Sequence, residues 1–99
     1  MDVYLRDYDI NPGLMPEFLE TWGTRVLPLR ERCGFTLLGA WADEASDRFV
    51  CVLGYAGPGD IDAADEHYQA LPEHQPIAQE SYRLIKEAHI TRLAAVERA

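Results

Sequence analysis

A two-residue period runs through residues 3–8 at the start of the chain. In an extended segment one side would carry Val3, Leu5 and Asp7, and the other Tyr4, Arg6 and Tyr8. This period, together with β-branched and aromatic residues, predicts a β-strand. The segment Asn11-Pro12-Gly13 is expected to end the strand, because proline and glycine together favour a turn.

A helical period follows, from about Leu14 to Arg32. Its apolar stripe recurs at three- and four-residue steps and consists of Leu14, Phe18, Trp22, Val26 and Leu29. Pro16 fits the first turn, where its missing N–H has no intrahelical partner. Pro28 is predicted to kink the helix or to begin a second short segment near Leu27. Gly34 would then end the helical stretch.

Two nearly continuous apolar runs come next, Phe35 to Ala42 and Arg48 to Tyr55, and a polar turn at 43–47 separates them. The arrangement predicts a β-hairpin. A strand exposed to water on one side would show a polar residue at every second position, so both faces of this hairpin are expected to be covered. Strict alternation places Phe35, Leu37, Gly39 and Trp41 on one face, and Leu38, Ala40 and Ala42 on the other.

The last third of the chain begins with a turn at Gly57-Pro58-Gly59. Asp60 is a suitable N-cap for a helix whose apolar stripe is Ile61, Ala64, Tyr68 and Leu71, and Pro72 ends that helix. Residues 73–82 are polar and irregular, and a loop with some helical turn is predicted there. Residues 84–96 give a mixed pattern, in which a last strand around residues 89–93 is favoured because it completes the fold.

The predicted order β-α-β-β-α-β fits one α+β domain over residues 1–99: a four-stranded antiparallel sheet with both helices on one face, the ferredoxin-like plan. That plan leaves the other sheet face bare. The apolar residues predicted there would form a patch larger than monomers usually carry. A second copy of the chain, related by a two-fold axis, is the simplest cover, so a homodimer is expected.

Charge and composition narrow the classes of partner. The net charge is −8, from 17 acidic and 9 basic residues, so neither nucleic acid nor a membrane surface is an expected partner. No signal peptide or membrane-spanning run is visible, and a soluble, cytoplasmic protein is expected. Cys33 and Cys51 lack metal-ligand spacing and are interpreted as small buried residues, with a bridge between them left open.

Many residues along the chain also match the sequence pattern of a known protein family. The shared pattern is Tyr4-Leu5-Arg6-x-Tyr8, Pro12-Gly13, Phe18, Trp22, Pro28-Leu29, Gly34-Phe35, Leu38-Gly39-Ala40-Trp41, Phe49-Val50, Tyr55, Asp65-x-x-Tyr68 and Pro72-Glu73. It resembles the NIPSNAP-type proteins of the dimeric α/β-barrel superfamily, over most of the chain to about residue 74. The resemblance implies a homodimer with a pocket between helices and sheet. It implies no single reaction, because the superfamily ranges from monooxygenases to binding proteins.

Arg6, between two tyrosines, is the first candidate for a functional residue. If its face of the strand lines a pocket, Arg6 would clamp a carboxylate or an enolate, and Tyr4 and Tyr8 would orient it. The alternative is a structural arginine paired with Asp7, Asp9 or a helix carboxylate. Three further aromatic residues are candidates for stacking on a planar ligand or, more simply, for core packing: Trp22, Trp41 and Tyr68.

The three histidines, His67, His74 and His89, do not have the spacing of a metal site, and neither a metal nor a cofactor is expected. His67 is predicted to be exposed. His74 lies just past a helix end, where the superfamily sometimes places a functional residue, and is the second weak catalytic candidate beside Arg6. No nucleophile elbow, P-loop or dinucleotide fingerprint is present.

Three hypotheses for function remain open. The first is a homodimeric module that binds a small aromatic or acyl compound. The second is a cofactor-independent monooxygenase or an isomerase or cyclase of the same superfamily; haem degradation is a weaker variant, since the Asn/Trp/His set of those enzymes has no clear match. The third is a structural or protein-partner-binding module whose pocket is closed by side chains.

Overall fold

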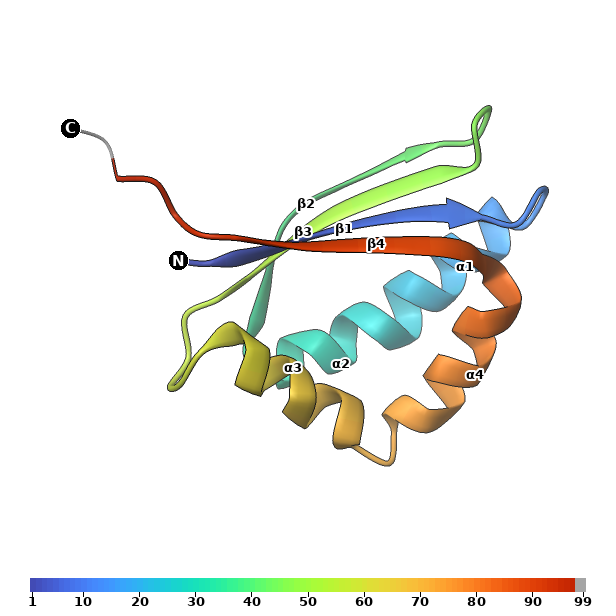
Figure 1. Ribbon diagram of the computed structural model, residues 1–99. Helices are drawn as coiled ribbons and strands as arrows, with labels where there is room; N and C mark the ends of the chain where they lie inside the picture. The colour runs from blue at the N-terminus through green and yellow to red at the C-terminus, as the bar shows by residue number, and fades with distance from the viewer. Residues whose placement is uncertain (98–99) are drawn as a thin grey trace.

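The computed structural model describes residues 1–97 as one antiparallel sheet with every helix on the same side of it (Figure 1). The elements are β1 (Val3–Ile10), α1 (Met15–Thr21), the π-helical turn η1 (Trp22–Val26), α2 (Leu27–Arg32), β2 (Phe35–Asp43), β3 (Arg48–Tyr55), α3 (Ile61–Ala70), α4 (His74–Leu84) and β4 (Ile85–Leu93). The strand order is β2-β3-β1-β4, and each neighbouring pair is antiparallel. This is the predicted ferredoxin-like fold.

The first helical stretch contains the interruption predicted from Pro28. In η1 the backbone N–H of Leu27 donates to the carbonyl of Trp22, five residues back. Pro28 has no N–H to donate, and the wider turn just before it accommodates this loss within a continuous helical path. The second segment, α2, begins at Leu27, as predicted.

The hairpin of β2 and β3 forms as predicted, but one assignment of side chains to faces is wrong. Leu37 pairs with Leu53 and Gly39 pairs with Val52, so Leu38 is an extra residue, a β-bulge. Beyond a bulge the alternation of faces shifts by one residue. Trp41 therefore lies on the opposite face from Phe35 and is 62% exposed, instead of facing the helices with it.

The prediction of a loop at residues 73–82 is also wrong, because α4 occupies His74–Leu84. Ile77 and Leu84 are two turns apart and both bury their side chains against the rest of the core. Pro76 is tolerated because it lies in the first turn, where backbone N–H groups have no intrahelical acceptor. β4 then begins directly at Ile85, which confirms the last strand and extends it to nine residues.

The core lies between the sheet and the helices. Its centre is an aromatic cluster in which the ring of Phe49 lies 4.8 Å from Phe18, 5.1 Å from Trp22 and 6.0 Å from Tyr8. Cys51 is fully buried beside it on β3. Cys33 and Cys51 are both free thiols, so the bridge that the sequence left open does not form. No helix within residues 1–97 has the length and apolar content needed to cross a membrane.

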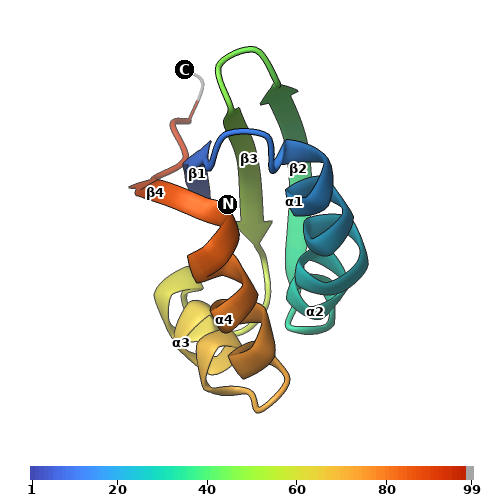
Figure 2. The same cartoon turned by 90° about the vertical axis from the view of Figure 1, so that its right-hand side faces the viewer.

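The face of the sheet away from the helices is uncovered in the single chain (Figures 1 and 2). We call it the open sheet face; its apolar residues are Val3, Leu5, Leu38, Trp41, Val50, Val52 and Leu93. Leu38 is 54% exposed, and Leu93 is also an exposed large apolar residue. The helices on the other side form two groups, α1 to α2 and α3 to α4, as Figure 2 shows.

Candidate functional site

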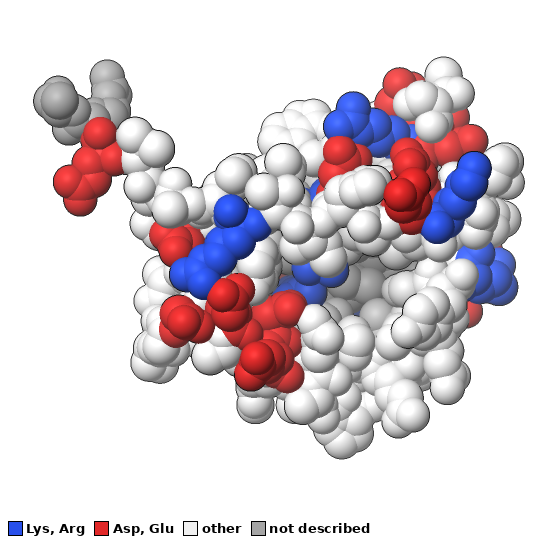
Figure 3. All heavy atoms as spheres, in the orientation of Figure 1, with Lys and Arg blue, Asp and Glu red and all other residues white. Residues whose placement is uncertain are grey.

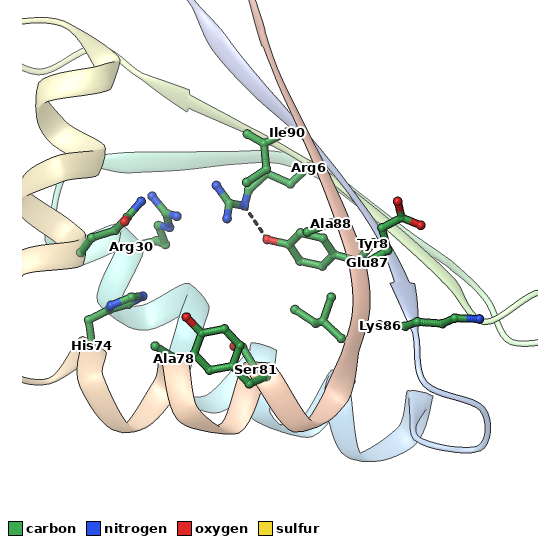
Figure 4. Close-up of a pocket in the computed structure, with 13 residues that line it drawn as sticks. Arg6, Tyr8, Arg30, His74, Ala78, Ser81, Lys86, Glu87, Ala88 and Ile90 are labelled. Atoms are coloured by element: carbon green, nitrogen blue, oxygen red, sulfur yellow. Dashed lines mark hydrogen bonds between the residues drawn. The ribbon is translucent and has the colours of Figure 1, made fainter.

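A cavity of about 430 Å³ lies between the sheet and the helices, beside strands β1 and β4 and helix α4 (Figure 4). Its volume is in the range of about 300–1,000 Å³ that is typical of small-molecule sites. Its polar lining includes Arg6, Tyr8, Arg30, His74, Ser81 and Tyr82, and its apolar lining Ala78, Ile85, Ala88 and Ile90. The hollow is visible near the middle of the face in Figure 3, with basic atoms inside it.

Arg6 points from β1 into this cavity, together with Tyr8 on the same face of the strand. Its Nε–H donates to the Tyr8 hydroxyl oxygen at 2.6 Å. Within residues 1–97 no carboxylate forms an ion pair with Arg6. Asp7, the partner proposed in the structural alternative, lies on the other side of the sheet and pairs with Arg48 at 2.6 Å and 3.0 Å.

The electrostatic surroundings of Arg6 keep it charged. Burial lowers the pKa of its guanidinium, but Tyr8 and the Asp65 carboxylate raise it, and the net pKa lies above the usual value. A cation without a neutralising partner inside a partly apolar cavity favours the binding of an anion. This holds even though the protein as a whole carries a net charge of −8.

Arg30, on α2, is a second cation at the cavity, and it is only 3% exposed. Its Nη1 donates to Asp65 at 2.6 Å, and its guanidinium carbon lies 3.8 Å from the centre of the Tyr68 ring. Its buried Nε has no hydrogen-bond partner within residues 1–97. Because Asp65 compensates Arg30, the uncompensated charge that points into the cavity is that of Arg6; the side chain of Lys86, which also lines the cavity, is directed away from Arg6 and His74 (Figure 4).

His74 begins α4 and lies across the cavity from the Arg6–Tyr8 pair (Figure 4). Its ring packs edge-on against Tyr68, with centroids 4.7 Å apart. Burial and then the Arg30 cation lower the pKa of His74 below its usual value. The imidazole is therefore neutral at pH 7 and able to accept a proton.

The structure brings together three of the residues proposed from the sequence, Arg6, Tyr8 and His74. The other candidates do not line the cavity. Tyr4 is buried, and its hydroxyl donates to Asp62. Burial is the larger cause of the raised pKa of the Tyr4 phenol, and this hydrogen bond is the second. Trp22 and Tyr68 pack in or against the core, and Trp41 lies on the open sheet face.

Several lining residues were missed by reasoning from the sequence. Arg30 precedes Glu31 and Arg32 in a polar run, which gives no sign that it alone is buried. The residues that α4 contributes to the cavity were missed because this segment was predicted to be a loop. Its cavity-facing side includes Ala78, Ser81 and Tyr82, at positions i, i+3 and i+4, and Ile85, the first residue of β4, continues the series at i+7. That helical period is the signal that would have found them.

One group of side chains within residues 1–97 has the composition of a metal site: Asp9, Glu87 and His89, whose ligand atoms all lie within 4.8 Å of one another. The group lies on the opposite side of the sheet from the Arg6 guanidinium. Side chains alternate between the two faces of a strand, and Asp9 is an odd number of residues, three, beyond Arg6. Glu87 and His89 are exposed, and a Glu87 carboxylate oxygen lies 3.3 Å from His89 Nε2. This direct contact accounts for their proximity without a metal ion.

Solved structures with the same fold cover almost the whole chain. A NIPSNAP domain protein from Burkholderia xenovorans has a TM-score of 0.83 at 22% identity, over 97% of this chain and 95% of that one. A NIPSNAP family protein from Agrobacterium tumefaciens has a TM-score of 0.84 at 18% identity, over 99% and 88%. An antibiotic biosynthesis monooxygenase has a TM-score of 0.72 at 15% identity, over 98% and 100%. At such identities these similarities show the fold alone.

No curated protein matches the chain. The NIPSNAP family model, in contrast, matches residues 3–97, which run from the first residue of β1 to beyond the end of β4. The chain therefore belongs to the NIPSNAP family.

Proposed function

We propose that this protein binds a small, partly apolar organic anion, such as an aromatic or acyl carboxylate, in the cavity beside β1, β4 and α4. The observation that carries the proposal is Arg6: a cation without a carboxylate partner within residues 1–97, directed into a cavity whose walls are partly apolar. A planar carboxylate matches the geometry of a guanidinium, whose terminal nitrogens donate two parallel hydrogen bonds.

Tyr8 adds a second donor to this anion site. Its hydroxyl oxygen already accepts from Arg6 Nε, so its own O–H is free to donate to a ligand oxygen. The apolar part of the ligand would contact Ala78, Ile85 and Ile90. Covering about 100 Å² of apolar surface contributes about 2.5 kcal/mol, so charge and burial contribute comparably to affinity.

The open cavity favours a ligand-binding protein over the third hypothesis, a module with a closed interior. The second hypothesis, a cofactor-independent enzyme, is favoured by one further observation, the neutral imidazole of His74 opposite the Arg6–Tyr8 pair. The likeness to a monooxygenase concerns the fold and adds no reaction. If the protein is an enzyme, the cavity suits a proton-transfer reaction, because it presents a neutral imidazole opposite two hydrogen-bond donors.

We further infer that the functional unit is a homodimer joined through the open sheet face. Trp41, Leu38 and Leu93 are exposed there in the single chain. At about 25 cal/mol per Å², covering about 800 Å² per subunit is strongly favourable before the costs of association. The cavity lies on the other side of the sheet, so each subunit of such a dimer would keep its own binding site.

The ligand-binding proposal is tested by calorimetric titration with 3-phenylpropionate and octanoate, and with 3-phenylpropionamide as an uncharged analogue. We expect the acids to bind at least about tenfold more tightly than the amide, since a hydrogen bond to a charged group is worth about 1.5–3 kcal/mol. Arg6→Met should remove that preference. Arg25→Met, which removes an exposed arginine on η1, should leave the binding unchanged.

A second variant separates loss of the site from loss of the fold. Ala78→Phe places a ring into the cavity from α4 and should block all three ligands while the protein keeps its cooperative thermal transition. Equal affinity of the acids and the amide, or unchanged binding by Arg6→Met, would contradict the proposal.

A further inference from the structure

We propose that the cavity is a proton-transfer site for 2-oxo acids that carry an apolar group: His74 takes the proton from the carbon next to the keto group, and Arg6 and Tyr8 stabilise the resulting enolate. The proposal rests on the ligand-binding function above and names the substrate class and the chemistry of the same site. It uses the arrangement of three side chains on two sides of one cavity, with the Arg6–Tyr8 pair on one side and His74 on the other.

The base is the first requirement of such a reaction. His74 lines the cavity and its ring is fixed against Tyr68, so the imidazole is presented from a defined position. The charged groups that face it come from each neighbouring element: Arg6 on β1, Arg30 on α2 and Asp65 on α3. The two cations outweigh the carboxylate, which together with burial keeps the imidazole unprotonated at neutral pH.

Stabilisation of the developing negative charge is the second requirement. When a carbon next to a carbonyl loses its proton, the carbonyl oxygen becomes an enolate oxygen and gains charge. Donors that are already in place around that oxygen lower the barrier, because they need no reorganisation. Arg6 and Tyr8 are such donors, held together by the 2.6 Å hydrogen bond between Arg6 Nε and the tyrosine oxygen.

A 2-oxo acid is the ligand class that uses all of these groups at once. Its carboxylate and its keto oxygen lie on adjacent carbons. The carboxylate would bind the terminal nitrogens of Arg6, and the keto oxygen would accept from the neighbouring Tyr8 hydroxyl. The next carbon carries the acidic C–H and would point across the cavity towards His74 (Figure 4). The apolar group beyond it would contact Ala78 and Ile85 on α4 and at the start of β4.

The step balances without any co-reactant. The C–H bond breaks and the proton moves to the free ring nitrogen of His74. The electron pair of that bond forms the carbon–carbon double bond, and the π pair of the carbonyl moves to oxygen. Return of the proton from His74 to that oxygen gives the enol, and the reverse sequence restores the keto form. Nothing is oxidised or reduced, so the reaction is a keto–enol interconversion.

Phenylpyruvate is the probe, and exchange of its C3 protons for deuterium, followed by NMR in D₂O, is the measurement. We expect the wild-type protein to exchange them faster than buffer alone. The His74→Gln substitution should slow this protein-dependent exchange by about 10²–10⁴-fold, which is the usual contribution of a general base. The variant should still bind 3-phenylpropionate, which has no keto group to enolise. The control is His67→Gln, which removes an exposed histidine on α3 and should retain the exchange.

The pH profile gives an independent readout of the base. Because the pKa of His74 lies below its usual value of 6.5, the exchange rate should fall as acid protonates the imidazole, with its midpoint below pH 6.5. A merely structural role of His74 would not produce this profile.

Failure of this inference can be told apart from failure of the binding function. If 3-phenylpropionate binds but phenylpyruvate exchanges no faster than in buffer, the proton-transfer site is overturned and the binding function stands. If neither compound binds, both proposals fail. Exchange that survives in His74→Gln, or that is lost equally in His67→Gln, would overturn the assignment of His74 as the base.

Discussion

Arg30 lies between the rings of Tyr68 and Phe35, with its guanidinium carbon 3.8 Å and 4.8 Å from their centres. Asp65 neutralises it through a 2.6 Å contact. Although this pair carries no net charge, the Arg30 cation still contributes to lowering the pKa of His74. A single buried arginine thus links the packing of the core to the protonation state of the cavity.

Burial also separates the two cysteines in their reactivity. Burial raises the pKa of the Cys51 thiol to about 11, and its side chain is 0% exposed. At pH 8 a thiol with that pKa is about 0.1% thiolate, and the thiolate is the reactive form. Ellman's reagent should therefore label Cys33, which is half-buried, and leave Cys51 unlabelled in the native protein.

Two controls complete the thiol experiment. Both cysteines should react after denaturation, and Cys33→Ser should leave no fast-reacting thiol in the native state. Labelling of two thiols at equal rates in native wild-type protein would show that Cys51 is not buried in solution.

At the scale of elements, helix α3 holds Asp65 and Tyr68 in place and begins at a well-formed cap. The Asp60 carboxylate accepts from the backbone N–H of Ala63 at 2.8 Å. The cap follows the predicted turn at Gly57 to Gly59, so a short polar segment sets where the helix starts. Because α3 carries two of the partners of Arg30, Asp65 and Tyr68, the stability of this cap bears on the geometry of the cavity wall.

We expect Asp60→Ala to lower the free energy of unfolding by about 1 kcal/mol, since the exposed N–H of Ala63 loses its acceptor. Asp60→Asn keeps an acceptor oxygen and should cost only a few tenths of a kcal/mol. Urea denaturation measures both values. A loss that is equally large in the two variants would assign the effect to the charge of Asp60 instead of the hydrogen bond.

At the scale of the whole molecule, the two faces of the sheet have different roles. One face carries the core and the cavity, and the other is the open sheet face with exposed Trp41. The net charge of −8 opposes close approach of two copies, so the proposed dimer depends on apolar burial over a limited area. Salt should therefore strengthen the association by screening this repulsion.

The dimer is tested by light scattering coupled to size-exclusion chromatography at micromolar concentration. We expect twice the 11.2 kDa mass of the chain, and a monomer for Trp41→Lys, which places a charge among the apolar residues of the open sheet face. Tyr82→Lys is the matched control, because Tyr82 is 85% exposed on the helical side and lies away from that face. A wild-type monomer at these concentrations would contradict the proposal.

The sequence by itself determined the features that depend on local spacing. The strand at Val3, the hairpin, the helix start after Asp60 and the new helical segment at Leu27 all follow from periodicity or from the backbone chemistry of proline and acidic caps. The placement of Tyr4, Arg6 and Tyr8 on a common face followed too, because alternation within an uninterrupted strand assigns each residue to one face.

Only the tertiary structure decided the features that depend on contacts between distant segments. The bulge at Leu38 moved Trp41 to the open sheet face, and the packing of Ile77 and Leu84 turned an expected loop into α4. The burial of Arg30 depends on Asp65, 35 residues away, and on the rings around it. The cavity joins β1, α2 and α4, whose polar residues show no common pattern along the chain. Local periodicity reports which side of an element is apolar, whereas the meeting of Arg6, Arg30 and His74 depends on how the helices pack on the sheet.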